Sequence, residues 1–143
     1  MRRVYVNEKW CLGCRLCEYN CAFANSGMQD MVKALKDVQI NPRIKVEKAN
    51  GISFAVQCRH CKDPLCVKVC IAGALHLDED GVIRIDQSKC VGCHSCVMAC
   101  PYGAIMPSGS GVMQKCELCL QNSSKEPACV KGCPNKAIVY EER

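Results

Sequence analysis

The sequence predicts an α+β protein made of short β-hairpins and short helices. Three observations support this fold class. Sixteen cysteines fall into four short runs spread along 143 residues. Brief alternating apolar stretches are separated by turn signals such as Asn50-Gly51. Helical periodicity, in contrast, covers only short segments. The length indicates one domain.

The first third of the chain predicts a strand and two helices. Residues 2–6 alternate as a short strand does, and a short helix is expected between Cys14 and Ala24. Residues 28–38 have helical spacing and end before Asn41-Pro42. We expect this second helix to pack on the body of the protein, and a docking face for a partner is the alternative. Its apolar positions are Met28, Met31, Val32, Leu35 and Val38.

Hairpins are predicted in the middle of the chain. Ile44–Val46 and Ile52–Val56 flank Asn50-Gly51, a strong hairpin signal. Ala74–Leu77 and Val82–Ile85 form a second candidate pair around an acidic turn that ends in glycine.

The last third of the chain predicts a loop and a strand. Pro, Ser and Gly predict a loop from Met106 to Gly111. Ala137–Tyr140 is predicted as a last strand, able to pair with Val4–Val6 and so to bring the termini together.

The stretch from Cys90 to Pro101 reads Cys-Val-Gly-Cys-His-Ser-Cys-Val-Met-Ala-Cys-Pro. Three cysteines two residues apart, then a fourth after three more and a proline, form the ligand run of bacterial [4Fe-4S] proteins. In such runs the fourth thiolate serves a neighbouring cluster, so one run implies another. Together the four runs use every cysteine: Cys11, Cys14, Cys17, Cys21; Cys58, Cys61, Cys66, Cys70; Cys90, Cys93, Cys96, Cys100; Cys116, Cys119, Cys129, Cys133.

This exchange of the fourth cysteine predicts four [4Fe-4S] clusters, each held by three cysteines of one run and the last cysteine of another. The second and third runs exchange their last cysteines within one unit, whose two halves a hairpin joins. Because this unit is inserted between the first and fourth runs, those two runs are assigned to each other. The predicted sets are Cys58, Cys61, Cys66 and Cys100; Cys90, Cys93, Cys96 and Cys70; Cys11, Cys14, Cys17 and Cys133; and Cys116, Cys119, Cys129 and Cys21.

The repeat is nested, and both units resemble bacterial ferredoxin. Residues 58–100 form an inner two-cluster unit, inserted into an outer two-cluster unit made of residues 1–57 and 101–143. The whole chain, 1–143, is predicted to be a single polyferredoxin domain. Without its cysteines the hydrophobic content is only roughly 38%, so the clusters would supply much of the core.

Charge and hydropathy exclude several classes of function. The formal charge is +5, but four thiolate-bound clusters at about −2 each bring the holoprotein to roughly −3. A nucleic-acid partner is therefore not expected. Arg2-Arg3 precedes no apolar run, so we expect no signal sequence, no membrane span and a soluble cytoplasmic protein.

Other uses of these cysteines fit less well. Structural zinc sites use Cys-x-x-Cys pairs but have no need of the third closely spaced cysteine. Disulfides are expected in exported proteins. His60 and His94 lie inside complete thiolate runs, so we expect them to pack near a cluster or to donate to its sulfurs, and His76 to lie on a surface strand.

Trp10 and several lysines lie close to the runs. Trp10 precedes Cys11 and would either shield a cluster from water or pack in the ordinary way. The lysines are expected mostly on a solvated surface, where some would steer an acidic partner. They are Lys62, Lys68, Lys115, Lys125 and Lys131.

The second run has a wider spacing than the others, and the last run has a longer gap between Cys119 and Cys129. With these features the whole chain resembles the four-cluster iron–sulfur subunits of the molybdopterin-oxidoreductase family. Those subunits are similar to dimethyl sulfoxide reductase beta subunits. Stretches from Cys11 to Glu18, Met31 to Leu35 and Gln57 to Cys61 are most similar to the ferredoxin-like subunits that accompany nickel carbon monoxide dehydrogenases. Two features depart from the pattern: Ala22 and Ile71 stand where proline is usual, and the gap after Cys119 is short.

The resemblance implies an electron-transfer subunit of an oxidoreductase complex in anaerobic metabolism, rather than an enzyme in itself. Its expected partners are a catalytic subunit, carbon monoxide dehydrogenase by this resemblance, and a second carrier such as a ferredoxin or a flavoprotein. Alternatives are the small subunit of a tungsten or molybdenum aldehyde oxidoreductase or formate dehydrogenase, a free ferredoxin shuttle, and a zinc or cluster-sensing regulator. No catalytic residue or nucleotide motif is left over once the thiolates are assigned.

Overall fold

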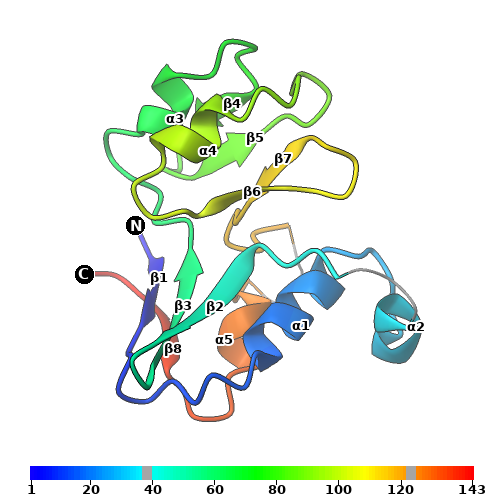
Figure 1. Cartoon of the computed structure of the whole chain (residues 1–143), viewed down its shortest axis with the longest axis vertical. Coiled ribbons are helices and arrows are strands. Elements are labelled where there is room, and N and C mark those ends of the chain that lie inside the picture. Colours follow the sequence, from blue (N-terminus) through cyan, green and yellow to red (C-terminus); the bar gives the residue numbers. More distant parts are fainter. Residues whose placement is uncertain (37–39, 122–124) are drawn as a thin grey trace.

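The computed structural model describes residues 1–36, 40–121 and 125–143 (Figure 1). Short helices and short strands alternate along the described chain, which confirms the α+β class. In chain order they are β1 (Arg3–Val6), α1 (Leu16–Ala24), α2 (Met31–Leu35), β2 (Ile44–Ala49), β3 (Ile52–Gln57), α3 (Leu65–Lys68), β4 (Leu75–Leu77), β5 (Ile83–Ile85), α4 (Ser95–Ala99), β6 (Ile105–Pro107), β7 (Met113–Lys115), α5 (Ala128–Lys131) and β8 (Ile138–Glu141).

The described strands pair in twos, all antiparallel: β1 with β8, β2 with β3, β4 with β5, and β6 with β7. The β1–β8 pair places Val4 opposite Tyr140 and joins the two ends of the chain, as the sequence predicted. Figure 1 shows the N- and C-termini next to each other. The first and last cysteine runs are therefore neighbours in space.

The β2–β3 hairpin confirms the Asn50-Gly51 signal. Ala49 pairs with Ile52, which leaves Asn50 and Gly51 as the two turn residues, with φ of 51° and 77°. Positive φ at both positions is what a type I′ turn requires. Along β2, Ile44 and Val46 are buried while the residues between and after them are exposed, so one face of the hairpin packs on the core.

Two further hairpins lie in the second half of the chain. The β4–β5 pair was predicted, with Leu75 opposite Ile85. The β6–β7 pair was not: we expected only a loop from Met106 to Gly111, and the structure adds three-residue strands on both sides of it. These strands are too short to show alternation in the sequence. Strand β7 also contacts β5, which is remote from it along the chain.

The helix boundaries differ from the sequence expectation for local reasons. Helix α1 begins after Arg15, whose φ of 63° is not helical, and it continues past Cys21 because Ala22 replaces the usual proline. Helix α2 covers only Met31–Leu35, capped by the Asp30 side chain, and Val38 lies outside the described residues.

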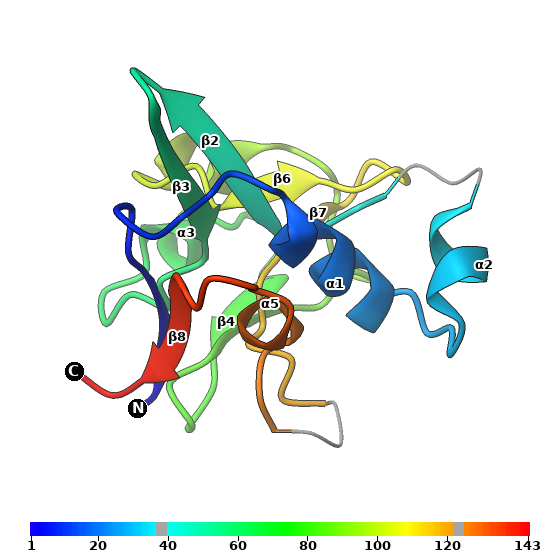
Figure 2. The same cartoon turned by 90° about the horizontal axis from the view of Figure 1, so that it is seen from below.

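The expectation that helix α2 packs on the body was wrong for most of its apolar positions. Met28, Met31 and Val32 are exposed, and Val32 is 74% exposed. Figure 2 shows α2 at the edge of the molecule, where it contacts α1 and buries Ala34.

Cysteines and aliphatic side chains form the core together. The larger cluster joins Val4, Ile44 and Ile138 to buried cysteines, and the smaller one joins Leu75 and Met113 to Cys96. The cysteines buried in the larger cluster are Cys17, Cys21, Cys58, Cys116 and Cys129. In Figure 1 the β6–β7 hairpin lies between the part with α3, α4, β4 and β5 and the part with α1, α5 and the terminal strands. Among the described helices, none is long and apolar enough to cross a membrane.

Candidate metal centres

The four cysteine runs share one backbone feature. In every run the residue two positions after the first cysteine has a positive φ: 66° at Gly13, 47° at His60, 70° at Gly92 and 61° at Leu118. A left-handed residue in a turn directs successive backbone N–H groups into one concave space, which favours negative charge. At Gly92 a side chain would also be too close, since a Cβ would lie 2.9 Å from the oxygen of Gly111.

Two of the predicted thiol sets each line one cavity. We call them the terminal sets. One contains the first three cysteines of the chain and the last one, and the other contains three cysteines of the third run and the last of the second. They are Cys11, Cys14, Cys17 and Cys133 in one cavity, and Cys70, Cys90, Cys93 and Cys96 in the other.

In each of the other two predicted sets, which we call the central sets, at least three of the four thiols lie near one another. Cys21, Cys116 and Cys119 line a third cavity. Burial raises the pKa of Cys129, the fourth member of this set, and charge on the same three thiols raises it further. For Cys66, burial raises the pKa to about 11, with Cys58 and Cys100 as neighbouring thiols. Cys61, the fourth member of this set, lies in the same loop as Cys58 and lines a separate cavity described below.

Burial opposes ionisation of these thiols when they stand alone. Desolvation raises the pKa of Cys17 and of Cys116 to about 12, and that of Cys21 to about 11. A metal centre coordinated by thiols holds them as thiolates and releases their protons on binding. A cationic metal core would therefore offset the cost of gathering four buried thiolates in one place.

Backbone N–H groups point at several of the sulfurs. Hydrogen bonds of this kind favour the thiolate and, in iron–sulfur proteins, are one of the factors that set the reduction potential. The donors and acceptors are Arg43 N to Cys21 Sγ at 3.2 Å, Ala74 N to Cys70 Sγ at 3.3 Å, Met113 N to Cys90 Sγ at 3.4 Å, Leu118 N to Cys116 Sγ at 3.4 Å and His60 N to Cys58 Sγ at 3.5 Å.

Lys115 is fully buried between the two central sets. Its exposed fraction is 0%, and its Nζ donates to the backbone oxygens of Cys116, at 2.7 Å, and of Ile83. Burial raises the pKa of Cys58, and the Lys115 ammonium offsets part of that rise. The expectation of a surface lysine was therefore wrong. Its burial follows from the β6–β7 hairpin, which the sequence did not reveal.

Glu18 is a second buried charge that the sequence did not single out. It is 6% exposed, accepts a 2.6 Å hydrogen bond from the backbone N–H of Val46, and lies 3.9 Å from the guanidinium of Arg15. Glu18 directly follows Cys17, which is a member of one terminal set. After burial, the Glu18 carboxylate is the largest cause that raises the pKa of Cys17.

The histidines and the tryptophan are placed differently from one another. His60 is buried, its Nδ1 accepts from Ile83 N at 3.0 Å, and burial lowers its pKa to about 3, so its ring is neutral. His94 and His76 are exposed, and His76 lies on β4 as predicted. Trp10 is 55% exposed, which leaves little of the ring to shield a cluster.

Cys14 and Cys93 are the exposed cysteines, one in each terminal set. Each lies beside a bulky apolar residue on the surface: Leu12 and Val91 are both 66% exposed. No three His, Cys, Asp or Glu side chains in the described ranges are arranged to hold a single metal ion. Two of the sets place four thiols around one cavity, which is the number of thiolates that a four-iron cluster takes.

The fold and these thiol sets define an iron–sulfur electron-transfer protein. Residues 49–143 match the 4Fe-4S dicluster domain, and the chain belongs to that family. It is 38% identical to an iron–sulfur protein of Rhodospirillum rubrum, over 94% of this chain and 79% of that protein. It is 35% identical to the electron transport protein HydN of Escherichia coli, over 99% of this chain and 89% of HydN. It is 34% identical to the thiosulfate reductase electron transfer subunit PhsB of Salmonella typhi, over 94% of this chain and 72% of PhsB.

These relatives confirm the broader prediction from the sequence, which is an electron-transfer subunit rather than a catalytic one. They support iron–sulfur clusters as its cofactors. The finer resemblance, to subunits that accompany nickel carbon monoxide dehydrogenases, stays a prediction.

Proposed function

We propose that the sixteen cysteines hold four [4Fe-4S] clusters and that the protein relays single electrons between a catalytic oxidoreductase subunit and a second redox partner. One observation carries the proposal. Three cavities are each lined by cysteines of two different runs, in the combinations that the exchange of the fourth cysteine predicts. When bound, each cluster would accept and give up one electron, and the chain would hold, space and insulate it.

Electrostatic contacts between the sets support a linear order. Burial is the main cause that raises the pKa of Cys129 and of Cys116. Charge on Cys17, in one terminal set, adds to the rise at Cys129, and charge on Cys58, in the other central set, adds to the rise at Cys116. At the far end, the N–H of Cys100 donates to the backbone oxygen of Cys96 at 3.1 Å, which joins the second central set to the second terminal set. The relay would then begin and end at the sets that contain the exposed Cys14 and Cys93.

The partner is proposed from the sequence resemblance. Carbon monoxide dehydrogenase is the first candidate for the catalytic subunit, and an aldehyde oxidoreductase or formate dehydrogenase is the alternative. A ferredoxin or flavoprotein in the cytoplasm would be the second carrier. A free shuttle remains the main competing function. The exposed Met28, Met31 and Val32 around helix α2 favour a bound partner, because an apolar surface is stabilised when another protein covers it.

We also propose that the domain is single and nested, with residues 58–100 inserted between 1–57 and 101–143. The pairing of β1 with β8 supports an outer unit closed by both ends of the chain.

The decisive test is elemental analysis of protein purified anaerobically from its source, with whatever remains bound to it. About sixteen irons per chain are expected for four clusters. Nickel in a bound larger chain would identify carbon monoxide dehydrogenase, whereas tungsten or molybdenum would identify the alternative enzymes. A fully loaded protein that elutes alone would favour the shuttle, and stoichiometric zinc would refute the proposal.

A further inference from the structure

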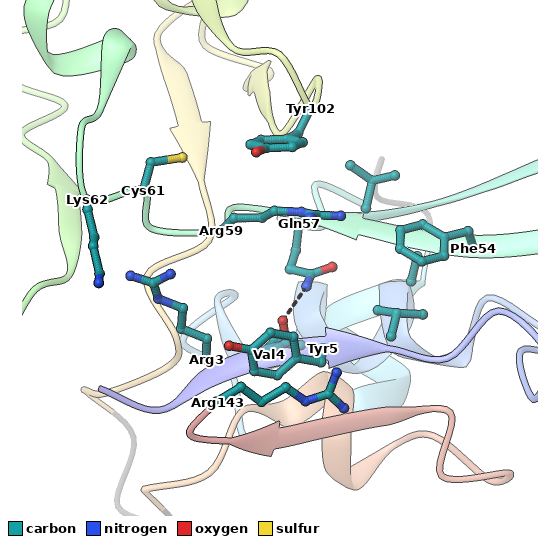
Figure 3. Close-up of a pocket in the computed structure, with 13 residues that line it drawn as sticks. Arg3, Val4, Tyr5, Phe54, Gln57, Arg59, Cys61, Lys62, Tyr102 and Arg143 are labelled. Carbon is teal, nitrogen blue, oxygen red and sulfur yellow. Dashed lines mark hydrogen bonds between the residues drawn. The ribbon is translucent and has the colours of Figure 1, made fainter.

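A wide basic cavity lies between strands β1 and β3, away from the two ends of the proposed relay. Its volume is about 770 Å³. Figure 3 shows Val4 and Tyr5 of β1 below it, Gln57 and Phe54 of β3 above and beside it, and Tyr102 at the top. Four cationic side chains also line it and define what we call the basic cavity: Arg3, Arg59, Lys62 and Arg143.

The charge of this cavity is not balanced within the described chain. Among the residues that the structure describes, no aspartate or glutamate lines it. Arg143 pairs with Glu141, at 2.5 Å between Nε and Oε1, but Arg3, Arg59 and Lys62 form no ion pair with any described residue. Cations gathered in one hollow repel each other and attract an anionic group from solution.

The cavity is also ordered before anything binds. The Arg59 guanidinium lies 4.5 Å from the centre of the Tyr102 ring, and that of Arg143 lies 4.3 Å from the centre of the Tyr5 ring. Stacking of this kind fixes the plane of a guanidinium while its N–H groups stay free to donate. A carboxylate that meets such a side chain can accept two parallel hydrogen bonds.

One unpartnered buried donor in the lining also points to an anionic occupant. Gln57 is 6% exposed, and its Nε2 donates to the backbone oxygen of Val4 at 3.0 Å. Its Oε1 and the Nε of Arg3 are buried without a partner among the described residues. Buried polar groups in native proteins are nearly always satisfied. The Nε of Arg3 is a donor that a carboxylate can satisfy, whereas the Gln57 oxygen is an acceptor and gives no support to an anionic occupant.

The cavity reaches one of the central thiol sets. Cys61 lines it, and Figure 3 shows the sulfur of Cys61 between Lys62 and Arg59. Cys61 belongs to the predicted set with Cys58, Cys66 and Cys100. A group bound in the basic cavity would therefore lie beside the middle of the relay, not beside Cys14 or Cys93.

We propose that the basic cavity docks an acidic segment of a redox protein, whose carboxylates pair with Arg3, Arg59 and Lys62, and that electrons can enter or leave the relay there. This would be a third point of exchange. One electron would leave the reduced partner and enter the oxidised cluster beside Cys61, with no proton transferred. The inference rests on the proposed clusters.

The experiment measures how fast reduced acidic ferredoxin transfers electrons to the oxidised holoprotein, by anaerobic stopped-flow absorbance. We compare the wild type with the double variant Arg59→Glu/Lys62→Glu. A matched control, Lys125→Glu/Lys131→Glu, changes the net charge by the same amount at exposed positions outside the cavity. Methyl viologen radical, a small cation, serves as a second reductant that cannot use carboxylate docking.

At low ionic strength we expect the cavity variant to be reduced by ferredoxin at least tenfold more slowly than the control, and to react with methyl viologen as fast or faster. High salt should remove the difference. Equal rates for the two variants would overturn the inference. Binding of inorganic phosphate is measured by calorimetry as well. If the ferredoxin rates are equal and only the cavity variant loses phosphate binding, the cavity is a site for small anions and docking is refuted.

Iron content and visible absorbance of each variant separate this inference from the proposed function. A wild type that cannot be loaded with iron would refute the clusters themselves. Fully loaded variants with unchanged ferredoxin rates would refute only the docking site.

Discussion

The central and terminal thiol sets differ in burial and in the sign of the charge beside them. The centre includes the buried Cys21, Cys116 and Cys129, with Lys115 as a buried cation. The two ends include the exposed Cys14 and Cys93. The terminal set at Cys17 has the buried carboxylate of Glu18 next to it. A relay needs access at its ends, and its middle must hold charge away from water, which favours a fixed counter-ion there.

The exposed ends are also apolar. Around Cys93 and its set the chain exposes Val91, Met98 and Ile71, and Met98 is 88% exposed. Apolar residues around a reactive centre are expected where a partner protein excludes water. The chain itself covers most of the centre, and the centre meets solvent beside Cys61, in the basic cavity. Each of the following predictions tests this difference, from the largest expected effect to the smallest.

Replacing a central cysteine should damage the protein far more than replacing a terminal one. Cys129→Ser removes a ligand that is 5% exposed and packs in the larger core cluster. We expect loss of its cluster and a fall in unfolding free energy of more than about 4 kcal/mol, the range seen when a structural metal is lost. Cys93→Ser, at an exposed position, should leave the fold intact. Iron analysis and thermal unfolding of the two variants give the answer, and equal losses would refute the distinction.

The exchange of the fourth cysteine predicts which cluster a variant loses. Cys100→Ser should disturb the central cluster built on Cys58, Cys61 and Cys66, and should spare the terminal cluster that follows Cys90 in the same run. Cys70→Ser is the reciprocal variant and should disturb the terminal one. Electron paramagnetic resonance of the reduced proteins distinguishes the two. Selective loss of the terminal signal in Cys100→Ser would refute the pairing.

Lys115→Met should lower the reduction potential of the central clusters. Removing a buried positive charge makes it harder to add an electron nearby, and a tenfold change in the equilibrium corresponds to about 59 mV for a one-electron step. We expect a fall of at least this size at the centre and a much smaller change at the ends. Redox titration followed by electron paramagnetic resonance measures both.

Lys131→Met is the matched control, since Lys131 is exposed in α5. A uniform shift of all clusters in Lys115→Met, or a central shift no larger than in the control, would contradict a local role for Lys115.

How much of this arrangement the sequence revealed depends on how local each feature is. The cysteine runs and the Asn50-Gly51 turn are local patterns, so the β2–β3 hairpin could be predicted, while the assignment of each thiol to a cluster stays a prediction. The burial of Lys115 could not, because it depends on β5 and β7 meeting across the fold, and three-residue strands leave no periodic signal. Glu18 was missed for the same reason: its partner is the backbone of Val46, far along the chain.

The smallest expected effect concerns Glu18, whose charge has the opposite sign to that of Lys115. Glu18→Gln removes the carboxylate beside Cys17 and weakens the hydrogen bond from Val46 N, at an expected cost of about 1–2 kcal/mol in unfolding free energy. It should also raise the potential of the terminal cluster at Cys17, because an added electron would no longer face a buried anion. Glu47→Gln is the control: its ion pair with Lys45 is solvent-exposed and should contribute less than about 1 kcal/mol. If Glu18→Gln lowered the terminal potential, charge beside the thiols would not be what separates the ends from the centre.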